Sequence, residues 1–350
     1  MNEDQLKIVD VQTRLTEAPL KRPFVTHLHQ VSAIRAVQVQ VTLRNGMVGI
    51  GAATPNEQVT GDTIASLKEV AESVIAPELI GLSLGHLETL MGRLNSVIRY
   101  NEPAKAAFDI AIYDLQSQIS GLPLTTLLGG AKHAMATDYT ISIGPQAQMV
   151  NEARQLVRDG FTALKVKIGN QPVQEDVAIV TAIADAVGPQ VALRIDVNQG
   201  WNYKEALLGI KMLADANLNI SFLEQPLPAA DLLGLAKLRA ESILPIMLDE
   251  SVFSPADALQ VIKAGAADLV NIKLMKSGGL YNATIINQLC ATAGIPCMVG
   301  CMIEAEESLA AALAFANAHE NVHFIDLDSC FMAKEDQLTK IKHQGPKLWL

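Results

Sequence analysis

Charged side chains recur in the second half of the chain where short apolar segments end. In chain order they are Lys165, Lys167, Asp196, Glu224, Asp249, Lys273, Asp326 and Asp328. A buried strand normally reads as an apolar run, so a charged residue in one needs a partner or a function. Residues two apart on a strand point the same way, so each of the pairs 165/167 and 326/328 aims both side chains at one place. The series predicts a charged site at the strand ends.

The carboxylates of three successive segments predict a metal site. Asp196, Glu224 and Asp249 would converge on one point, where they repel each other unless a cation lies between them. Hard oxygen ligands of this kind suit Mg²⁺, which keeps positions open for water or substrate. For any one of the three, an ion pair with a lysine or arginine of the barrel is the simpler explanation. The ordered series at the strand ends favours one Mg²⁺ per site.

Two lysines predict an acid/base pair. Lys167 and Lys273 lie on the second and sixth segments, which face each other across an eight-stranded barrel. A metal can take up the charge that builds when a proton leaves the carbon beside a carboxylate. A lysine serves as the base only if its pKa falls, and both Lys165 and the cation act in that direction. The predicted chemistry is removal and return of a proton beside a carboxylate.

The elements that must position these residues fit a barrel. After Gly130, eight apolar segments alternate with amphipathic helical stretches, at close to the ~31 residues per unit of a (β/α)₈ TIM-type barrel. Right-handed crossovers would make the strands parallel. A doubly wound sheet is the alternative, but no glycine-rich dinucleotide fingerprint follows its first strand. The predicted strands are 136–143, 162–168, 191–197, 220–224, 245–249, 268–274, 295–301 and 322–328.

The first third of the chain predicts an α+β domain. Residues 37–41 alternate apolar and polar side chains before Asn45-Gly46, a hairpin signal, and helical periodicity follows over 62–80 and 103–120. We expect a capping domain over residues 1–130 and the barrel over 131–329. The tail from about residue 330 to 350 is expected to pack on the cap.

Composition excludes several classes of protein. The 350 residues are 49% hydrophobic and 18% charged, with a net charge of −10 and no basic patch, so no nucleic-acid partner is expected. No apolar run reaches the ~18 residues of a membrane span, and the N-terminus does not read as a signal peptide. The four cysteines follow neither a zinc pattern nor a disulfide framework. We expect a cytoplasmic protein with buried free thiols and no membrane partner.

Five motifs in order resemble the enolase superfamily, and within it the muconate-lactonising subgroup. They are Lys165-Val166-Lys167, Asp196-Val197-Asn198-Gln199-Gly200, Glu224-Gln225-Pro226, Asp249-Glu250-Ser251 and the run from Asn271 to Gly279. The resemblance covers nearly the whole chain. It implies a modified (β/α)₈ barrel, (β/α)₇β, under an N-terminal α+β capping domain, and a homo-oligomer. It also implies the metal ligands and the lysine pair given above, with Asn198 and Glu250 supporting them.

A narrower resemblance is to the dipeptide epimerases, of the L-Ala-D/L-Glu epimerase type. Asp326-Leu327-Asp328 matches the Asp-x-Asp with which this group holds the α-ammonium of the substrate, and two adjacent carboxylates suit a cation. The resemblance also implies that Lys165 contacts the substrate carboxylate and that Thr140 and Met302 help to hold the dipeptide.

Two positions bear on the substrate side chain. His29 stands where Ala-Glu epimerases carry an arginine for the glutamate side chain, but it is equally well explained as an exposed loop histidine. Glu304 follows the seventh strand near the site and is a candidate for a substrate contact. Glu306 and Glu307 fit a first helical turn, where acids complement the helix dipole.

Three functions compete. The first is dipeptide epimerisation, a metal-assisted proton transfer at the α-carbon of the C-terminal residue of an L,L-dipeptide. The second keeps the site and changes the reaction, to an N-acylamino-acid racemase, an o-succinylbenzoate synthase or a cycloisomerase. Asp326 and Asp328 argue against these, because such substrates lack a free ammonium. The third is a non-catalytic metal-binding scaffold, which would have no need for Lys167 and Lys273.

Overall fold

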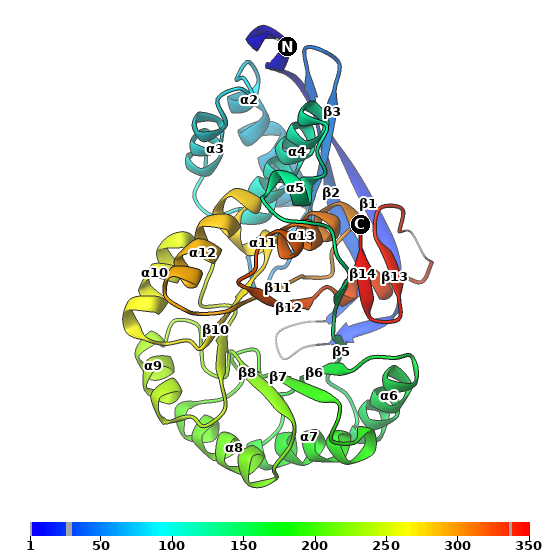
Figure 1. The fold of residues 1–350 in the computed structure, drawn as a ribbon, viewed down its shortest axis with the longest axis vertical. Coiled ribbons are helices and arrows are strands. Elements are labelled where there is room, and N and C mark those ends of the chain that lie inside the picture. The colour runs from blue at the N-terminus through cyan, green and yellow to red at the C-terminus, as the bar shows by residue number, and fades with distance from the viewer. Residues whose placement is uncertain (1, 26–29, 336–337) are drawn as a thin grey trace.

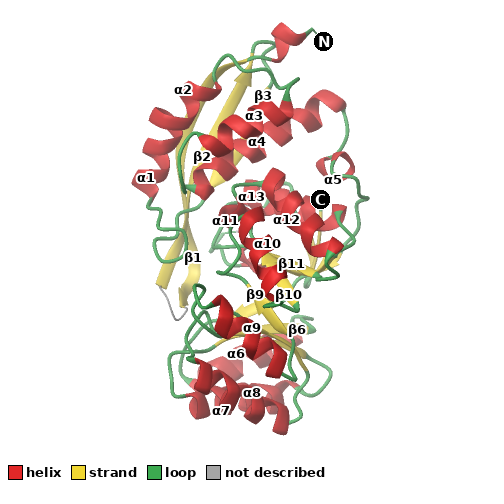
Figure 2. Ribbon diagram, turned by 90° about the vertical axis from the view of Figure 1, so that its left-hand side faces the viewer, coloured by secondary structure: helices red, strands yellow, loops and turns green. Residues whose placement is uncertain are grey.

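The computed structural model describes residues 2–25, 30–335 and 338–350 and has two parts, with the cap in the upper half of both views and the barrel in the lower half (Figure 1, Figure 2). The long strands of the cap run down one side of the molecule toward the barrel (Figure 2). Within the described residues, no helix combines the length and the apolar character needed to cross a bilayer.

The barrel is an eight-stranded parallel sheet in which chain order is also spatial order. An isolated parallel bridge between Thr137 and Ile325 joins its first and last strands. The eight predicted strands are confirmed with shorter bounds. They are β5 (Tyr139–Ile141), β6 (Ala163–Lys167), β7 (Ala192–Asp196), β8 (Ile220–Glu224), β9 (Ile246–Leu248), β10 (Leu269–Ile272), β11 (Cys297–Gly300) and β12 (Val322–Asp326).

Helices follow each strand from β5 to β11, which confirms the predicted (β/α)₇β barrel. They are α6 (Gln146–Arg158), α7 (Val173–Val187), α8 (Tyr203–Asp215), α9 (Leu232–Glu241), α10 (Pro255–Ala264), α11 (Leu274–Ser277) with α12 (Leu280–Thr292), and α13 (Glu306–Ala318). Capping residues in the sequence define where some of these helices begin. In α10, Ser254 and Asp257 form a capping box and Pro255 opens the helix.

The cap is a three-stranded antiparallel sheet covered by helices. Its strands are β1 (Ile8–Val25), β2 (Gln30–Leu43) and β3 (Val48–Ala53), and the predicted Asn45-Gly46 hairpin joins the last two. Helix α4 (Glu102–Ser120) ends at Gly121, whose φ of 68° is the left-handed form that glycine favours. A Cβ at Gly49 or Gly51 would overlap backbone oxygens of α4, so these glycines let the helix lie directly on β3.

Two helical details of the cap differ from the prediction. The predicted helix over 62–80 is interrupted: α1 (Ile64–Glu69) and α2 (Ala76–Leu79) flank a π-helical segment, Val70–Ile75. Ala76 N donates to Ala71 O, five residues back, just before Pro77, which has no N–H to donate. Helix α3 (Leu87–Ser96) was not predicted, although it buries Leu90, Met91 and Leu94 at helical spacing.

The cap helix α4 contacts the barrel beside Gly279. Asp109 of α4 accepts hydrogen bonds from Leu280 N (2.6 Å) and Tyr281 N (3.1 Å), the first residues of α12. Gly279, with φ 112°, lies against the Asp109 carboxyl, and a Cβ there would overlap it. A glycine is therefore required where the cap helix meets the barrel helix.

The tail touches both parts. Lys21 N donates to Met332 O and Lys334 N donates to Pro19 O, which ties the start of the tail to β1. The end of the tail forms β13 (Lys342–Gln344) and β14 (Lys347–Trp349), which pair with β4 (Met135–Ala136) beside the barrel. The short helices η1 (Glu3–Leu6), α5 (Leu124–Leu127) and η3 (Asp328–Phe331) complete the described chain. The domain boundary at residue 130 stays a prediction.

Candidate active site

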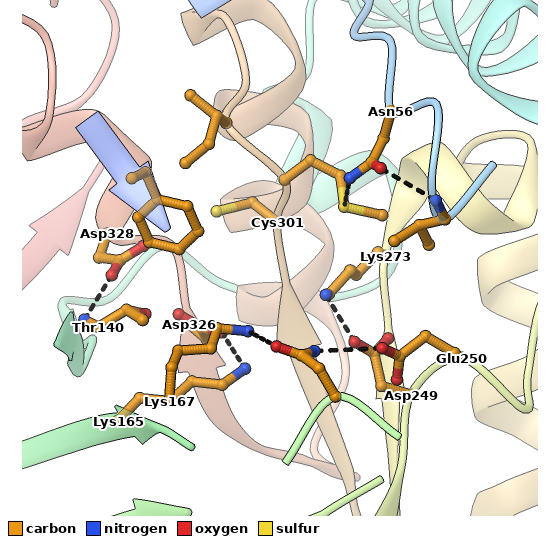
Figure 3. Close-up of a pocket in the computed structure, with 15 residues that line it drawn as sticks. Asn56, Thr140, Lys165, Lys167, Asp249, Glu250, Lys273, Cys301, Asp326 and Asp328 are labelled. Atoms are coloured by element: carbon orange, nitrogen blue, oxygen red, sulfur yellow. Dashed lines mark hydrogen bonds and ion pairs between the residues drawn. The ribbon is translucent and has the colours of Figure 1, made fainter. Parts of the chain in front are cut away.

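A pocket opens at the carboxyl ends of the barrel strands, under the cap (Figure 3). The barrel contributes most of its wall, and a loop of the cap closes it from above. Its predicted lining residues are Thr140, Lys165, Lys167, Asn198, Asp249, Glu250, Lys273, Met302, Asp326 and Asp328. Phe24, Asn56 and Val59 from the cap, and Cys301 and Ile303 from the loop after β11, complete it. Six of the eight strand-end charges thus line one cavity, and the other two, Asp196 and Glu224, are fully buried and do not line it.

Lys165 lies at the centre of the buried charges. Its Nζ is 3.0 Å from Asp196 Oδ2, 2.8 Å from Glu224 Oε2 and 2.8 Å from Asp326 Oδ2. Burial lowers the pKa of Lys165, but these three carboxylates raise it more, so the pKa lies well above its usual range. Lys165 therefore stays an ammonium that links the carboxylates of β7 and β8 with that of β12.

The predicted metal ligands are fully buried at the ends of adjacent strands. Asp196 and Glu224 are register partners on β7 and β8, and Asp249 directly follows β9. Glu224 Oε2 and Asp249 Oδ1 accept no hydrogen bond from any described residue, although a lysine Nζ lies 2.8 Å and 2.7 Å from them. Burial, and then the Asp196 charge, raises the pKa of Glu224 to about 7. Two buried oxygens of the predicted metal ligands therefore lack a hydrogen-bond donor among the described residues.

An all-oxygen set of this kind fits a hard divalent ion. As they stand, however, no three carboxylate, histidine or cysteine side chains of the described chain are gathered closely enough to hold a metal. The lysines explain this arrangement, because Lys165, Lys167 and Lys273 each draw a carboxylate oxygen toward their own ammonium. The chemistry of the donors fits Mg²⁺, and the positions of their oxygens reflect pairing with lysine.

The two predicted acid/base lysines reach the pocket from β6 and from the end of β10. Lys167 Nζ donates to Asp196 Oδ2 at 2.6 Å and to Asn198 Oδ1 at 2.9 Å. Lys273 Nζ donates to Asp249 Oδ2 at 2.6 Å. Each amine is thus bound to a predicted metal ligand, and four steps along the sheet separate β6 from β10.

The pKa of Lys273 differs in direction from the expectation for a base. Burial lowers it, but Asp249 raises it more, and the net pKa lies above its usual range. Lys165 does act in the expected direction, because its positive charge lowers the pKa of Lys273. The expectation left out how closely a predicted metal ligand approaches this lysine, since Asp249 Oδ2 lies 2.6 Å from Lys273 Nζ.

A second group of carboxylates lies on the opposite wall of the pocket from Asp249 and Glu250 (Figure 3). Asp328 Oδ2 accepts a 2.6 Å hydrogen bond from Thr140 N. Burial raises the pKa of Asp326, but the Lys165 ammonium lowers it to about 2. Burial, and then the Asp326 charge, raises the pKa of Asp328 to about 7. One of the two carboxylates is thus fixed by a lysine, and the other forms no ion pair with any residue that the structure describes.

Asn198 and Glu250 connect the two lysine regions. Besides binding Lys167, Asn198 donates from Nδ2 to Glu250 Oε1 at 3.1 Å and from its backbone N to Asp196 Oδ1 at 2.9 Å. Its φ of 44° turns the chain sharply after β7, which brings the amide back over the strand end. Burial, and then the Asp249 charge, raises the pKa of Glu250 to about 7.

The substrate contact predicted for Glu304 is not supported by its position. Glu304 lies outside the pocket, and its Oε1 accepts a 2.7 Å hydrogen bond from Met302 N, so it shapes the loop after β11. Glu306 and Glu307 are in the first turn of α13, as expected, but Glu306 binds backbone N–H groups of residues 339–341 and Glu307 binds Gln38. His29 lies outside the described residues.

Three buried charges near the site were not given a role from the sequence. Lys276 donates to the backbone oxygens of Asp249, Val252 and Asn271 and so holds the Asp249 loop from behind. Asp138 and Arg194 form a 2.7 Å ion pair inside the barrel below the site. The sequence spacing could have indicated the last two. Asp138 lies two residues before Thr140 and Arg194 two residues before Asp196, and residues two apart on a strand point to the same side.

Comparison with known proteins agrees with this geometry. Residues 8–129 match the family model described as the N-terminal domain of mandelate racemase / muconate lactonizing enzyme, and residues 148–344 match the enolase C-terminal domain-like family. The chain is 40% identical over 331 residues to the L-Ala-D/L-Glu epimerase of Bacillus subtilis, which spans 95% of this chain and 90% of that protein. It is 33% identical to the N-succinyl-L-Arg/Lys racemase of Bacillus cereus, over 92% of this chain and 87% of that protein.

Solved structures share the whole architecture. The dipeptide epimerase from Enterococcus faecalis, in complex with Mg and the dipeptide L-Leu-L-Tyr, superimposes with a TM-score of 0.94 at 38% identity and covers 98% of this chain and 97% of that one. The two family models together account for both the cap and the barrel that the structure displays. The chain therefore belongs to the enolase superfamily, in its mandelate racemase / muconate lactonizing enzyme group.

Proposed function

We propose that this protein is a Mg²⁺-dependent dipeptide epimerase that inverts the α-carbon of the C-terminal residue of an L,L-dipeptide. The observation that carries the proposal is the position of two kinds of group in one pocket. Lys167 and Lys273 enter the pocket from strands four steps apart in the barrel, and the carboxylates of Asp326 and Asp328 line the same pocket. A dipeptide has both an acidic α-carbon and a free ammonium.

Different residues of the pocket would bind different groups of the dipeptide. Asp326 and Asp328 hold the α-ammonium, with Thr140 fixing the second carboxylate. Lys165, which already bridges the two carboxylate groups, holds the C-terminal carboxylate of the substrate. The α-carbon of the C-terminal residue then lies between the two remaining lysines.

Lys167 and Lys273 would carry the proton. One of them, as the free amine, removes the α-proton from one face, while the other, as the ammonium, gives a proton to the opposite face. Returning the proton on the opposite face inverts the centre, and returning it on the same face restores the substrate. Asn198 holds Lys167 in place through its Oδ1, and Lys276 supports the loop that carries Asp249.

Asp196, Glu224 and Asp249 would hold the Mg²⁺. When bound, the ion supplies positive charge to stabilise the negative charge that develops on the substrate carboxylate as the proton leaves. Asp249 would then have a third cation beside the ammonium groups of Lys273 and Lys276, and its effect on the pKa of Lys273 would weaken. We expect Lys165 to move off Asp196 and Glu224 as the ion binds.

The experiment is a screen of L,L-dipeptides with Mg²⁺ in D₂O, read by mass spectrometry. An epimerase of this mechanism incorporates one deuterium at the α-carbon of the C-terminal residue during turnover. Apolar side chains that line the pocket include Phe24, Val59, Met302 and Ile303. We therefore expect dipeptides with a hydrophobic C-terminal residue to react faster than those with an acidic one. No deuterium gain across the library would reject the proposal.

A second candidate, an N-acylamino-acid racemase, is tested in the same screen. N-succinyl amino acids lack an ammonium, and the carboxylates of Asp326 and Asp328 would repel the succinyl carboxylate. We therefore expect no exchange with N-succinylarginine or N-succinyllysine, although a relative carries out that reaction. Exchange with these compounds, and none with dipeptides, would favour the second candidate.

We place the enzyme in the cytoplasm as a homo-oligomer, with a small dipeptide as its substrate and no nucleic acid or membrane partner. The absence of a bilayer-spanning helix among the described residues is consistent with this setting. Size-exclusion chromatography with light scattering tests the oligomer, and a single monomeric species at micromolar concentration would reject it.

A further inference from the structure

The seam between the first and last barrel strands depends on side chains. Besides the isolated Thr137–Ile325 bridge, Leu327 N donates to Thr137 Oγ1 at 2.9 Å and Thr140 N donates to Asp328 Oδ2 at 2.6 Å. The carboxylates proposed to hold the substrate ammonium therefore lie across this seam. Their positions depend on what β5 offers them.

Asp138, just before β5, is a fully buried carboxyl group beneath this site. Its Oδ2 accepts a 2.7 Å hydrogen bond from Arg194 Nη1, which also donates to Ile325 O at 2.9 Å. The Cζ of Arg194 lies 4.9 Å from the Phe324 ring centre. Its Oδ1 accepts no hydrogen bond from any donor in the described chain. The Asp326 side chain lies beside Asp138, since Arg194 binds both Asp138 Oδ2 and the carbonyl oxygen of Ile325, and a side-chain hydrogen bond with Asp138 lowers the pKa of Asp326.

Two ionised carboxylates cannot form such a contact, since neither has a hydrogen to donate. Asp326 is the ionised member, because Lys165 Nζ lies 2.8 Å from its Oδ2. The contact then requires a proton on the other member, and the oxygen left free to carry it is Asp138 Oδ1. The charged groups that face Asp138 are Asp326, Asp328, Arg194 and Lys165.

We propose that Asp138 is a positioning residue for the ammonium site: its Oδ1 carries a proton that it donates to Asp326, and this bond aims the Asp326 carboxylate into the pocket. Asp138 does not line the pocket, so it acts on the substrate through Asp326 alone. Burial, and then the Asp326 charge, raises the pKa of Asp138 well above its usual range, in agreement with this role. The inference rests on the proposed function only where it concerns substrate affinity.

The test compares Asp138→Asn with Asp138→Ala. An asparagine presents its Oδ1 to Arg194 and its Nδ2–H to Asp326, so it reproduces a protonated carboxyl and cannot reproduce an ionised one. We expect D138A to raise the KM for a dipeptide about tenfold, as for loss of one buried charge-assisted hydrogen bond, with a smaller change in kcat. We expect D138N to restore most of that affinity.

Asp109→Asn is the matched control. Asp109 is equally buried, but both of its oxygens accept backbone N–H groups, from Leu280 and Tyr281. Its amide variant must place N–H against N–H, so D109N should melt a few degrees below wild type, while D138N should melt close to wild type. A D138N variant as impaired as D138A, or a D138A variant with unchanged KM, would overturn the proposal.

A spectroscopic measurement separates this inference from the proposed function. The infrared difference spectrum of wild type minus D138N at neutral pH should contain the carbonyl band of an un-ionised carboxylic acid, which shifts in D₂O. A carboxylate band in its place would overturn the proposal whether or not the protein epimerises dipeptides. If the wild-type screen shows no exchange while this band is present, the proposed function fails and the protonated Asp138 stands.

Discussion

The affinity for a dipeptide should depend on pH through Asp328. Burial and the neighbouring Asp326 raise the pKa of this carboxyl to about 7, so it is largely protonated in the free enzyme below that pH. Only the ionised form attracts the substrate ammonium. With a pKa of about 7, the ionised fraction rises from about 0.09 at pH 6 to about 0.5 at pH 7, which predicts about fivefold tighter binding.

The sign and the range of this effect follow from the two partners. Raising the pH ionises Asp328 and strengthens binding, until the dipeptide ammonium itself begins to lose its proton near its pKa of about 8. The comparison between pH 6 and pH 7 therefore excludes titration of the dipeptide ammonium. Calorimetric titration with an alanyl-glycine dipeptide and saturating Mg²⁺ measures Kd at both values, because a C-terminal glycine binds without a net change of configuration.

Variants assign the effect to its residue. Asp328→Asn removes the titrating group, so its Kd should be weaker than wild type at pH 7 and should change little between the two pH values. Glu304→Gln is the control, because this buried carboxyl group, whose pKa burial also raises, lies outside the pocket and should leave the fivefold ratio intact. A wild-type ratio near one, or an unchanged ratio in Asp328→Asn, would refute the assignment.

Three further predictions concern the reaction, the metal and the cap. Lys167→Ala and Lys273→Ala should each abolish epimerisation and keep solvent exchange from one stereoisomer only, so full activity of either variant in the D₂O assay argues against the mechanism. Adding Mg²⁺ at about 100 times its Kd should stabilise the wild type by about 2.7 kcal/mol in denaturant titrations, and Glu224→Gln should reduce this gain; equal gains exclude the site. Gly279→Ala should destabilise the protein by about 1–3 kcal/mol, because φ 112° is unfavourable for alanine and its Cβ meets Asp109; an unchanged unfolding midpoint contradicts this.

The barrel and the positions of its charged residues could be predicted from the sequence because both depend on local patterns. Lys165, Asp196 and Asp326 stand out as charges in otherwise apolar strands, and the order of parallel strands fixes which of them become neighbours. The pocket that gathers them follows from strand direction alone. Which strand-end residues become neighbours is therefore a consequence of the strand order.

What could not be predicted depends on contacts between distant segments. Helix α3 is an exception, because its buried residues have helical spacing that the sequence already shows. The π-helical segment before Pro77, by contrast, reflects how a proline is accommodated when the chain is already packed. Glu304 looked like a pocket residue because of its distance along the chain from β11. Its side chain instead turns back to Met302 N, a choice that only the folded loop reveals.

The charges of the pocket also explain why metal and substrate should bind in a coupled way. One ammonium, that of Lys165, contacts Asp196 and Glu224 on one side and Asp326 on the other. A divalent ion held by Asp196 and Glu224 would repel that ammonium, and a dipeptide ammonium held by Asp326 would compete with it. Each ligand would therefore free Lys165 from one of the groups that the other ligand leaves in place. The substrate carboxylate then gives Lys165 a new partner. Each ligand would thus lower the free-energy cost of displacing the Lys165 ammonium for the other. Mg²⁺ should therefore tighten dipeptide binding, and by linkage the dipeptide should tighten Mg²⁺ binding by the same factor.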